Sequence, residues 1–159
     1  MRHKDEIPVL VAGIKDELSK LETLVQKLSS QKNRTKKEEV AESAALRLHN
    51  FYTGCERIFK LIASEVNGGV SHELDWHKRL LTQVALEIDG IRPAVISPQM
   101  RKDLAELLRF RHLVRNIYGF ELDAGRIDYL INLTAGIFPR FKKEVEKFVA
   151  FLTAIFNES

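Results

Sequence analysis

The stretch "IDYLINLTAGIFPRFKKEVEKFVAFLTAI", residues 127 to 155, predicts a long helix with one continuous buried face. Its apolar side chains recur at steps of three and four residues, which is the period of an amphipathic helix and not the alternation of a strand. The face is expected to consist of Ile127, Leu130, Thr134, Phe138, Phe141, Val145, Phe148, Leu152 and Ile155. Such a face must be covered by other elements, and no strand pattern competes elsewhere, so the sequence favours an all-α fold.

The rest of the chain shows helical periods separated by short polar breaks. Thr35 and Glu38 have the spacing of a capping box, and Ser97 followed by Pro98 is typical of a helix start. The expected helices span about 5–29, 35–66, 71–88, 97–119 and 123–155. Five helices with short connections predict an antiparallel bundle and a single domain over residues 1–159.

Composition narrows the class of protein. A hydrophobic share of 45% with 30% charged residues is ordinary for a globular chain, and the net charge of +3 permits contact with nucleic acid. The single Cys55 cannot form an internal disulfide, which indicates a reduced, intracellular setting. No signal peptide and no membrane-spanning run is recognisable, so a cytoplasmic protein is expected. The histidines lack ligand spacing, and we expect neither a metal nor another cofactor.

The stretch "FRHLVRNIYGFELD", residues 110 to 123, departs from the pattern of a plain core helix. Arg111 falls inside the core-facing stripe of the expected fourth helix. The apolar members of that stripe are expected to be Leu104, Leu107, Leu108 and Val114, with Tyr118 at its end. Arg115, His112, Asn116 and Arg109 lie on the adjoining flank, so the helix presents a polar strip beside its apolar face.

Arg111 can be interpreted in two ways. It either forms a buried ion pair with a carboxylate of another helix, Glu56 or Asp75, or it faces a groove that receives an anionic ligand. Tyr52 and Glu56 lie one turn apart, which suggests a polar contact that reaches toward this helix, and His77 is expected to be partly exposed beside the packing anchor Trp76. A cluster of Arg, His and Asn supplies what RNA cleavage without a metal requires, namely a proton acceptor and cations for the transition state.

The segment "RHLVRNIY", residues 111 to 118, resembles a motif of the HEPN superfamily, in which an arginine is followed by four residues, a histidine, one residue and a tyrosine. The segments "LHNFYTGCERIFKLIA" at 48–63 and "DWHKRLL" at 75–81 support the likeness, specifically to the HepT-like toxins of HEPN/MNT toxin–antitoxin pairs. The resemblance implies a helical, homodimeric ribonuclease. It also implies a minimal nucleotidyltransferase as antitoxin, which in some members attaches AMP to the motif tyrosine.

Carried over residue by residue, the resemblance makes Arg111 the motif arginine and Tyr118 the acceptor of AMP. The position of the motif histidine is occupied by Asn116. Asparagine can orient a hydroxyl or a phosphate oxygen but cannot act as a general base near neutral pH. Either His112 takes over the proton transfer, with Arg115 and Asn116 completing the catalytic set and Arg109 binding substrate, or activity is weak or absent.

Three classes of function therefore stay open: an RNA-cleaving toxin, a catalytically silent HEPN protein that binds RNA or a nucleotidyltransferase, and a structural dimer with a buried arginine network. A homodimer is expected because the fourth helix would otherwise expose Phe110, Leu113 and Ile117, which the core of one protomer cannot also cover.

Overall fold

The computed structural model of the chain describes residues 4–66, 75–115 and 122–158, with only the backbone described for residues 4, 66 and 112–115. Within these ranges the chain forms five α-helices, one short 3-10 helix and no β-strand, so the predicted all-α fold is confirmed. The elements are η1 (Lys4–Glu6), α1 (Ile7–Ser30), α2 (Glu38–Val66), α3 (Trp76–Val84), α4 (Pro98–Arg115) and α5 (Ala124–Asn157). No helix in these ranges combines the length and the apolar character needed to cross a bilayer.

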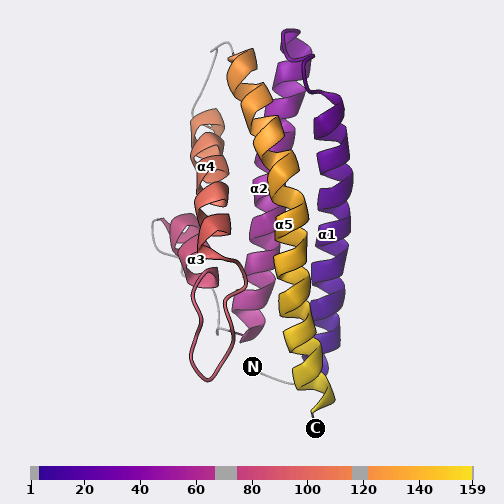
Figure 1. Ribbon diagram of the computed structural model, residues 1–159, viewed down its shortest axis with the longest axis vertical. Coiled ribbons are helices and arrows are strands. Elements are labelled where there is room, and N and C mark those ends of the chain that lie inside the picture. The colour runs from indigo at the N-terminus through magenta and orange to yellow at the C-terminus, as the bar shows by residue number, and fades with distance from the viewer. Residues whose placement is uncertain (1–3, 67–74, 116–121, 159) are drawn as a thin grey trace.

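The helices pack as a bundle in which the three long ones, α1, α2 and α5, lie side by side (Figure 1). Helices α1 and α2 are joined by the turn at 31–37. The shorter helices α3 and α4 lie together on one side of the bundle, where both contact α2 and where α4 also contacts α5. Helix α2 therefore connects the long-helix core to the α3–α4 side.

The face predicted for α5 forms the centre of this core. Eight of its nine predicted members are buried, and only Ile155 is half-buried. Two edge-to-face aromatic pairs join the face to α2: Phe51 with Phe138, at a ring-centroid distance of 6.3 Å, and Phe59 with Phe141, at 5.9 Å. This geometry is favourable for aromatic rings and fixes the register between the two helices.

Helices α1 and α2 approach each other closely at Gly54. A Cβ atom at this position would lie 2.5 Å from Cδ2 of Leu21 on α1. Leu21 is itself 2% exposed and surrounded by the core. The contact between α1 and α2 therefore depends on the missing side chain of Gly54.

The start of α2 differs from the prediction. The helix begins at Glu38, but Thr35 does not cap it. The Thr35 hydroxyl instead lies 2.9 Å from Oδ1 of Asp128 and 3.3 Å from the carbonyl oxygen of Ala124, both at the beginning of α5. The capping-box prediction for Thr35 is wrong, because the Thr35 hydroxyl donates its hydrogen bond to a carboxylate of a neighbouring helix instead. Thr35 thereby attaches the α1–α2 turn to α5.

Helix α3 ends earlier than predicted, at Val84 and not at Ile88. Its predicted start at Ser71 lies outside the described residues. The Arg92 guanidinium, from the following loop, donates hydrogen bonds to the carbonyl oxygens of Gln83, Leu86 and Pro93 at 2.9–3.1 Å. The last carbonyl oxygens of a helix lack hydrogen-bond donors within the helix. Arg92, which is 3% exposed, supplies such donors at the end of α3.

Helix α4 begins where the sequence predicts. The backbone N–H of Met100 donates to the Ser97 hydroxyl at 3.1 Å, which is an N-cap contact, and Pro98 follows in the first turn. Phe110 of this helix is only 5% exposed, because the core of the same chain covers it. The expectation that Phe110 stays exposed until a second protomer covers it is therefore wrong. The Leu113 side chain and Ile117 lie outside the described residues.

Candidate functional site

Arg111, the central residue of the predicted site, lies on the inner side of α4 and is 8% exposed. Its expected neighbours on the stripe, Leu104, Leu107 and Leu108, are likewise buried. A guanidinium in such surroundings needs charged or hydrogen-bonding partners, because desolvation of an unpaired charge costs several kcal/mol. These partners come from α2 and α3.

The partners of Arg111 are Glu56 of α2 and His77 of α3. Nη1 of Arg111 lies 3.6 Å from Oε1 of Glu56, and the other carboxylate oxygen, Oε2, lies 2.6 Å from Nδ1 of His77. Nη1 of Arg111 also lies 2.9 Å from the same Nδ1. The Glu56 and His77 side chains are 3% and 14% exposed. Of the two carboxylates predicted to pair with Arg111, the contact is made by Glu56, whereas Asp75 is exposed.

Nδ1 of His77 cannot serve both neighbours as a hydrogen-bond partner, because it would have to donate to the carboxylate and accept from the guanidinium. Donation to Glu56 is favoured for two reasons. The contact is the shorter one, and an unprotonated Nδ1 would direct its lone pair at a carboxylate. Nη1 of Arg111 then interacts with Oε1 of Glu56.

The plane of the His77 ring is fixed by stacking. The Trp76 ring lies against it with a centroid distance of 3.6 Å, and Nζ of Lys60 lies 4.2 Å above the centroid of the Trp76 ring. Trp76 thus has the packing role that the sequence predicts, and His77 is partly buried. The added finding is that His77 belongs to the same polar cluster as Glu56 and Arg111.

Two polar atoms beside this cluster have no hydrogen-bond partner among the described residues: the hydroxyl of Tyr52 and Nε of Arg111. Tyr52 is completely buried one turn before Glu56. Burial, reinforced by the Glu56 carboxylate, raises the pKa of the Tyr52 phenol far above its ordinary value. Tyr52 therefore remains neutral at any physiological pH and packs in the core, whereas Glu56 makes the polar contact that reaches the motif helix.

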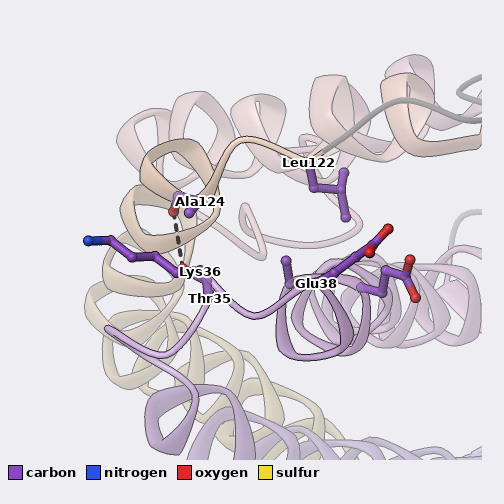
Figure 2. A pocket seen from close by; sticks show the side chains of 7 residues that line it. Thr35, Lys36, Glu38, Leu122 and Ala124 are labelled. Atoms are coloured by element: carbon purple, nitrogen blue, oxygen red, sulfur yellow. Dashed lines mark hydrogen bonds between the residues drawn. The ribbon is translucent and has the colours of Figure 1, made fainter.

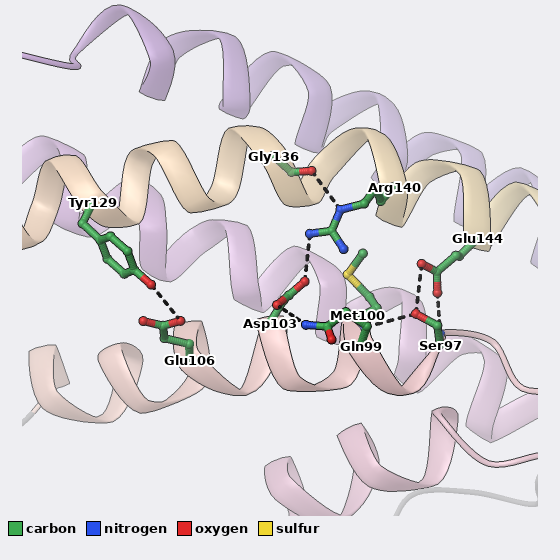
Figure 3. A network of polar contacts seen from close by, with 9 residues as sticks. All are labelled: Ser97, Gln99, Met100, Asp103, Glu106, Tyr129, Gly136, Arg140 and Glu144. Carbon is green, nitrogen blue, oxygen red and sulfur yellow. Dashed lines mark hydrogen bonds and ion pairs between the residues drawn. The ribbon is translucent and has the colours of Figure 1, made fainter.

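Helix α4, which carries Arg111, is fastened to α5 by a row of polar contacts (Figure 3). The Arg140 guanidinium donates to Asp103 at 2.8 Å, and the Tyr129 hydroxyl donates to Glu106 at 3.3 Å. At the start of α4, both the backbone N–H and the hydroxyl of Ser97 donate to the Glu144 carboxylate. These contacts hold the part of α4 from its start to Glu106, so Arg111 extends from a helix of defined position.

The other predicted site residues divide into two groups. Arg109 is described and exposed, as a substrate-binding role requires. His112 and Arg115 lie within α4, but their side chains are outside the described part of the structure, and so are Asn116 and the predicted AMP acceptor Tyr118. The sequence did not indicate that His77 joins the cluster. Its position beside Trp76 in "DWHKRLL" was the only available signal.

A cavity of about 340 Å³ lies elsewhere, where the α1–α2 turn meets the start of α5 (Figure 2). It is lined by Thr35, Lys36, Glu38, Ala41, Glu42, Leu122 and Ala124. Among the described residues, neither Arg111 nor its neighbours Glu56 and His77 line this cavity.

Comparison with known proteins identifies the family of this chain. A search of curated proteins and a search of solved structures each returned no match. The family described as HepT-like protein, by contrast, matches residues 43–152, more than half of the chain. This range includes Glu56, His77 and Arg111. The chain belongs to the HepT-like family.

Proposed function

We propose that the chain is the toxin of a HEPN/MNT toxin–antitoxin pair and that it cleaves RNA without a metal, as one HEPN domain over residues 1–159 acting in the cytoplasm. The observation that carries the proposal is the position of Arg111. In a HepT-like chain, the residue that matches the motif arginine is paired with Glu56, close to His77, on a helix that is fastened to α5. Membership of the family supports a HEPN-type role, and the fixed guanidinium supports chemistry on a phosphate.

In this proposal, Arg111 stabilises the negative charge that develops on phosphorus, since a guanidinium offers several donors in a fork that matches phosphate. Arg109 and Arg115 contact neighbouring phosphates, and Asn116 orients the reacting hydroxyl. The proton acceptor is His112, the histidine next to Arg111 in the sequence.

A second candidate function is supported by the pairing of Arg111. Its charge is balanced by Glu56 and it is largely buried, while asparagine occupies the position of the motif histidine. A catalytically silent HEPN protein that binds RNA or a nucleotidyltransferase needs no available guanidinium. In that case the cluster only stabilises the contact between α2, α3 and α4.

The experiment that separates these functions combines growth and cleavage. Expression of the chain should arrest growth, co-expression of the neighbouring nucleotidyltransferase gene should restore it, and the purified chain should cleave RNA in the presence of EDTA. Arg111→Ala should abolish both effects. Because this change leaves Glu56 buried without its cation, Arg111→Lys serves as a second variant that keeps the charge and loses the fork. Arg57→Ala, an exposed arginine on α2, is the matched control.

Growth arrest without RNA cleavage, or cleavage that Arg111→Lys and Arg111→Ala both retain, contradicts the proposed ribonuclease. Binding of RNA or nucleotidyltransferase with no cleavage by the wild-type chain supports the silent alternative.

We also propose that the toxin is a homodimer, as the resemblance implies, although the buried Phe110 no longer supports this. Light scattering at micromolar concentration tests it: a mass of two chains is expected, and a strictly monomeric mass contradicts it.

A further inference from the structure

Arg111, to which the proposed function assigns the RNA phosphate, is covered in this structure. Its side chain is only 8% exposed, and Glu56 of α2 and His77 of α3 are among the groups that cover it. The cavities of about 340, 350 and 460 Å³ among the described residues are lined by other side chains. A phosphate needs space beside a guanidinium, so part of this cover has to move before RNA can bind there.

The contact between α3 and Arg111 leaves hydrogen-bonding groups unsatisfied. Nδ1 of His77 donates to Glu56, so it offers no lone pair to Nη1 of Arg111, although the two nitrogens lie only 2.9 Å apart. Nε of the same guanidinium is buried and has no hydrogen-bond partner in the described part of the chain. A phosphate would supply the acceptors that this arrangement lacks, because its oxygens match the donors of an arginine.

Helix α3 is the element of this cover that is held least firmly at the contact. It has only nine residues, Trp76–Val84, and lies at the outside of the bundle beside α2 and α4 (Figure 1). Its N-cap residue, Asp75, has a φ of 67° and makes no capping hydrogen bond with its side chain. This left-handed region is strained for a residue with a Cβ atom, although aspartate tolerates it better than most.

The two ends of α3 differ in how they are attached. At the C-terminal end, the Arg92 guanidinium binds the carbonyl oxygen of Gln83, and the backbone N–H of Val95 donates to that of Val84. The buried side chains of the helix also lie in this half, from Leu80 onward. The N-terminal end, which carries Trp76 and His77, has a strained and uncapped start instead. Movement of this end therefore disturbs fewer contacts than movement of the whole helix.

We propose that α3 is a latch over Arg111, and that an RNA phosphate gains the guanidinium when the N-terminal end of α3 moves away from α4. This inference rests on the proposed binding of RNA at Arg111. Nη1 keeps its contact with Glu56, so the guanidinium keeps its place, while the space left by His77 admits the phosphate. Glu56 loses the contact with His77, but the same movement lets water reach its carboxylate.

The first test measures the affinity for a 2′-O-methyl RNA oligonucleotide, which has no free 2′-hydroxyl and stays uncleaved. We expect His77→Ala to bind about 3- to 10-fold more tightly than wild type, because affinity lost to the closed state is recovered. Any positive charge lost with the imidazole would weaken binding, so charge cannot produce this gain. Thr82→Ala, an exposed side chain of α3, is the matched control and should bind as wild type does. Adding Arg111→Lys to His77→Ala should remove the gain, since lysine lacks the fork.

The second test follows the latch itself. Trp76 is the single tryptophan of the chain, and its ring stacks on that of His77 at a centroid distance of 3.6 Å. Saturating RNA should shift its emission to the red and increase its quenching by acrylamide, because the partly buried ring becomes exposed to water. Arg111→Lys should show a smaller change at the same RNA concentration. Circular dichroism confirms that each variant keeps the helical fold.

The outcomes separate the latch from the proposed function. Binding by folded His77→Ala that is no tighter than wild type, or a Trp76 ring that RNA does not expose, overturns the latch while RNA binding stands. Both expected results without cleavage of unmodified RNA support the latch and overturn the ribonuclease. Absence of RNA binding by wild type and His77→Ala alike overturns the proposed RNA site and the latch together.

Discussion

Glu56 of α2 and His77 of α3 contact each other at 2.6 Å, and Arg111 of α4 completes the cluster on the second oxygen of the same carboxylate. One buried carboxylate of α2 thus contacts the imidazole of α3 and the guanidinium of α4, and so joins three helices. The stability of the α3–α4 side of the bundle and the placement of the candidate site depend on the same residue.

Removal of the Glu56 carboxylate should lower the free energy of unfolding. Glu56→Ala leaves the buried Arg111 guanidinium without its counter-charge, and we expect the free energy of unfolding to fall by about 3 kcal/mol in urea denaturation. Glu22→Ala is the matched control, since its ion pair with Lys142 is exposed, and it should change stability by less than about 1 kcal/mol. If the two variants lower the free energy of unfolding equally, the Glu56 cluster contributes no more to stability than an exposed ion pair does.

Substitution by alanine should have opposite effects on stability at two glycines that lie within helices. Gly54→Ala places a Cβ 2.5 Å from Cδ2 of Leu21, and the resulting displacement should destabilise the chain by about 1–3 kcal/mol. Gly136→Ala on α5 meets no atom within 4 Å, and it should stabilise by up to about 1 kcal/mol through helix propensity. Thermal unfolding measures both changes. A stabilising Gly54→Ala contradicts the close approach of α1 and α2.

The buried phenol of Tyr52 should make the chain sensitive to alkali. The pKa of Tyr52 is raised in the folded state, so stability is fully present below the ordinary value of 10.0 and declines as the pH rises from there toward the folded pKa. Tyr52→Phe should weaken this decline. It should also stabilise the chain by about 1 kcal/mol at neutral pH, because it removes a buried hydroxyl that has no hydrogen-bond partner in the described part of the chain.

Denaturation at pH 7 and at pH 10.5 measures both effects of Tyr52→Phe. Tyr129→Phe is the control, because that hydroxyl is exposed and donates to Glu106. An unchanged stability difference between the two pH values in Tyr52→Phe excludes Tyr52 as the source of the alkaline loss.

Attachment of AMP to Tyr118 would neutralise the proposed toxin by occupancy, because the added phosphate would bind the arginines that otherwise hold RNA. Intact-mass measurement after co-expression with the nucleotidyltransferase should show one or more AMP units. The adduct should be absent in Tyr118→Phe and present in Tyr129→Phe. Full neutralisation of an unmodified chain would mean that the antitoxin acts by binding alone.

The sequence predicted the helices well where burial is periodic. The face of α5 and the start of α4 follow from spacing within one element, because a helix that buries one side must repeat apolar residues along it. The same reasoning placed Arg111 on the inner face of α4 and identified Glu56 as a possible partner.

The contacts between elements were harder to predict. His77 meets Arg111 only because the short helix α3 packs against both α2 and α4, and no local pattern encodes that packing. Thr35 was assigned to its own helix, since the nearest backbone N–H donors in the sequence belong to that helix, but its hydroxyl donates to Asp128 of α5 instead. The end of α3 depends on Arg92, a residue eight positions beyond the last helical residue, Val84.

The buried guanidinium of Arg92 also determines how α3 opens. It binds the carbonyls at the end of α3, while the backbone N–H of Val95 donates to the carbonyl of Val84 at 2.8 Å. Helix α3 and the loop that follows it therefore share their hydrogen bonds and should unfold locally as one cooperative unit. The amide of Val95 should exchange with solvent deuterium at the rate at which this unit opens. That exchange rate measures how long His77 remains in place beside Arg111.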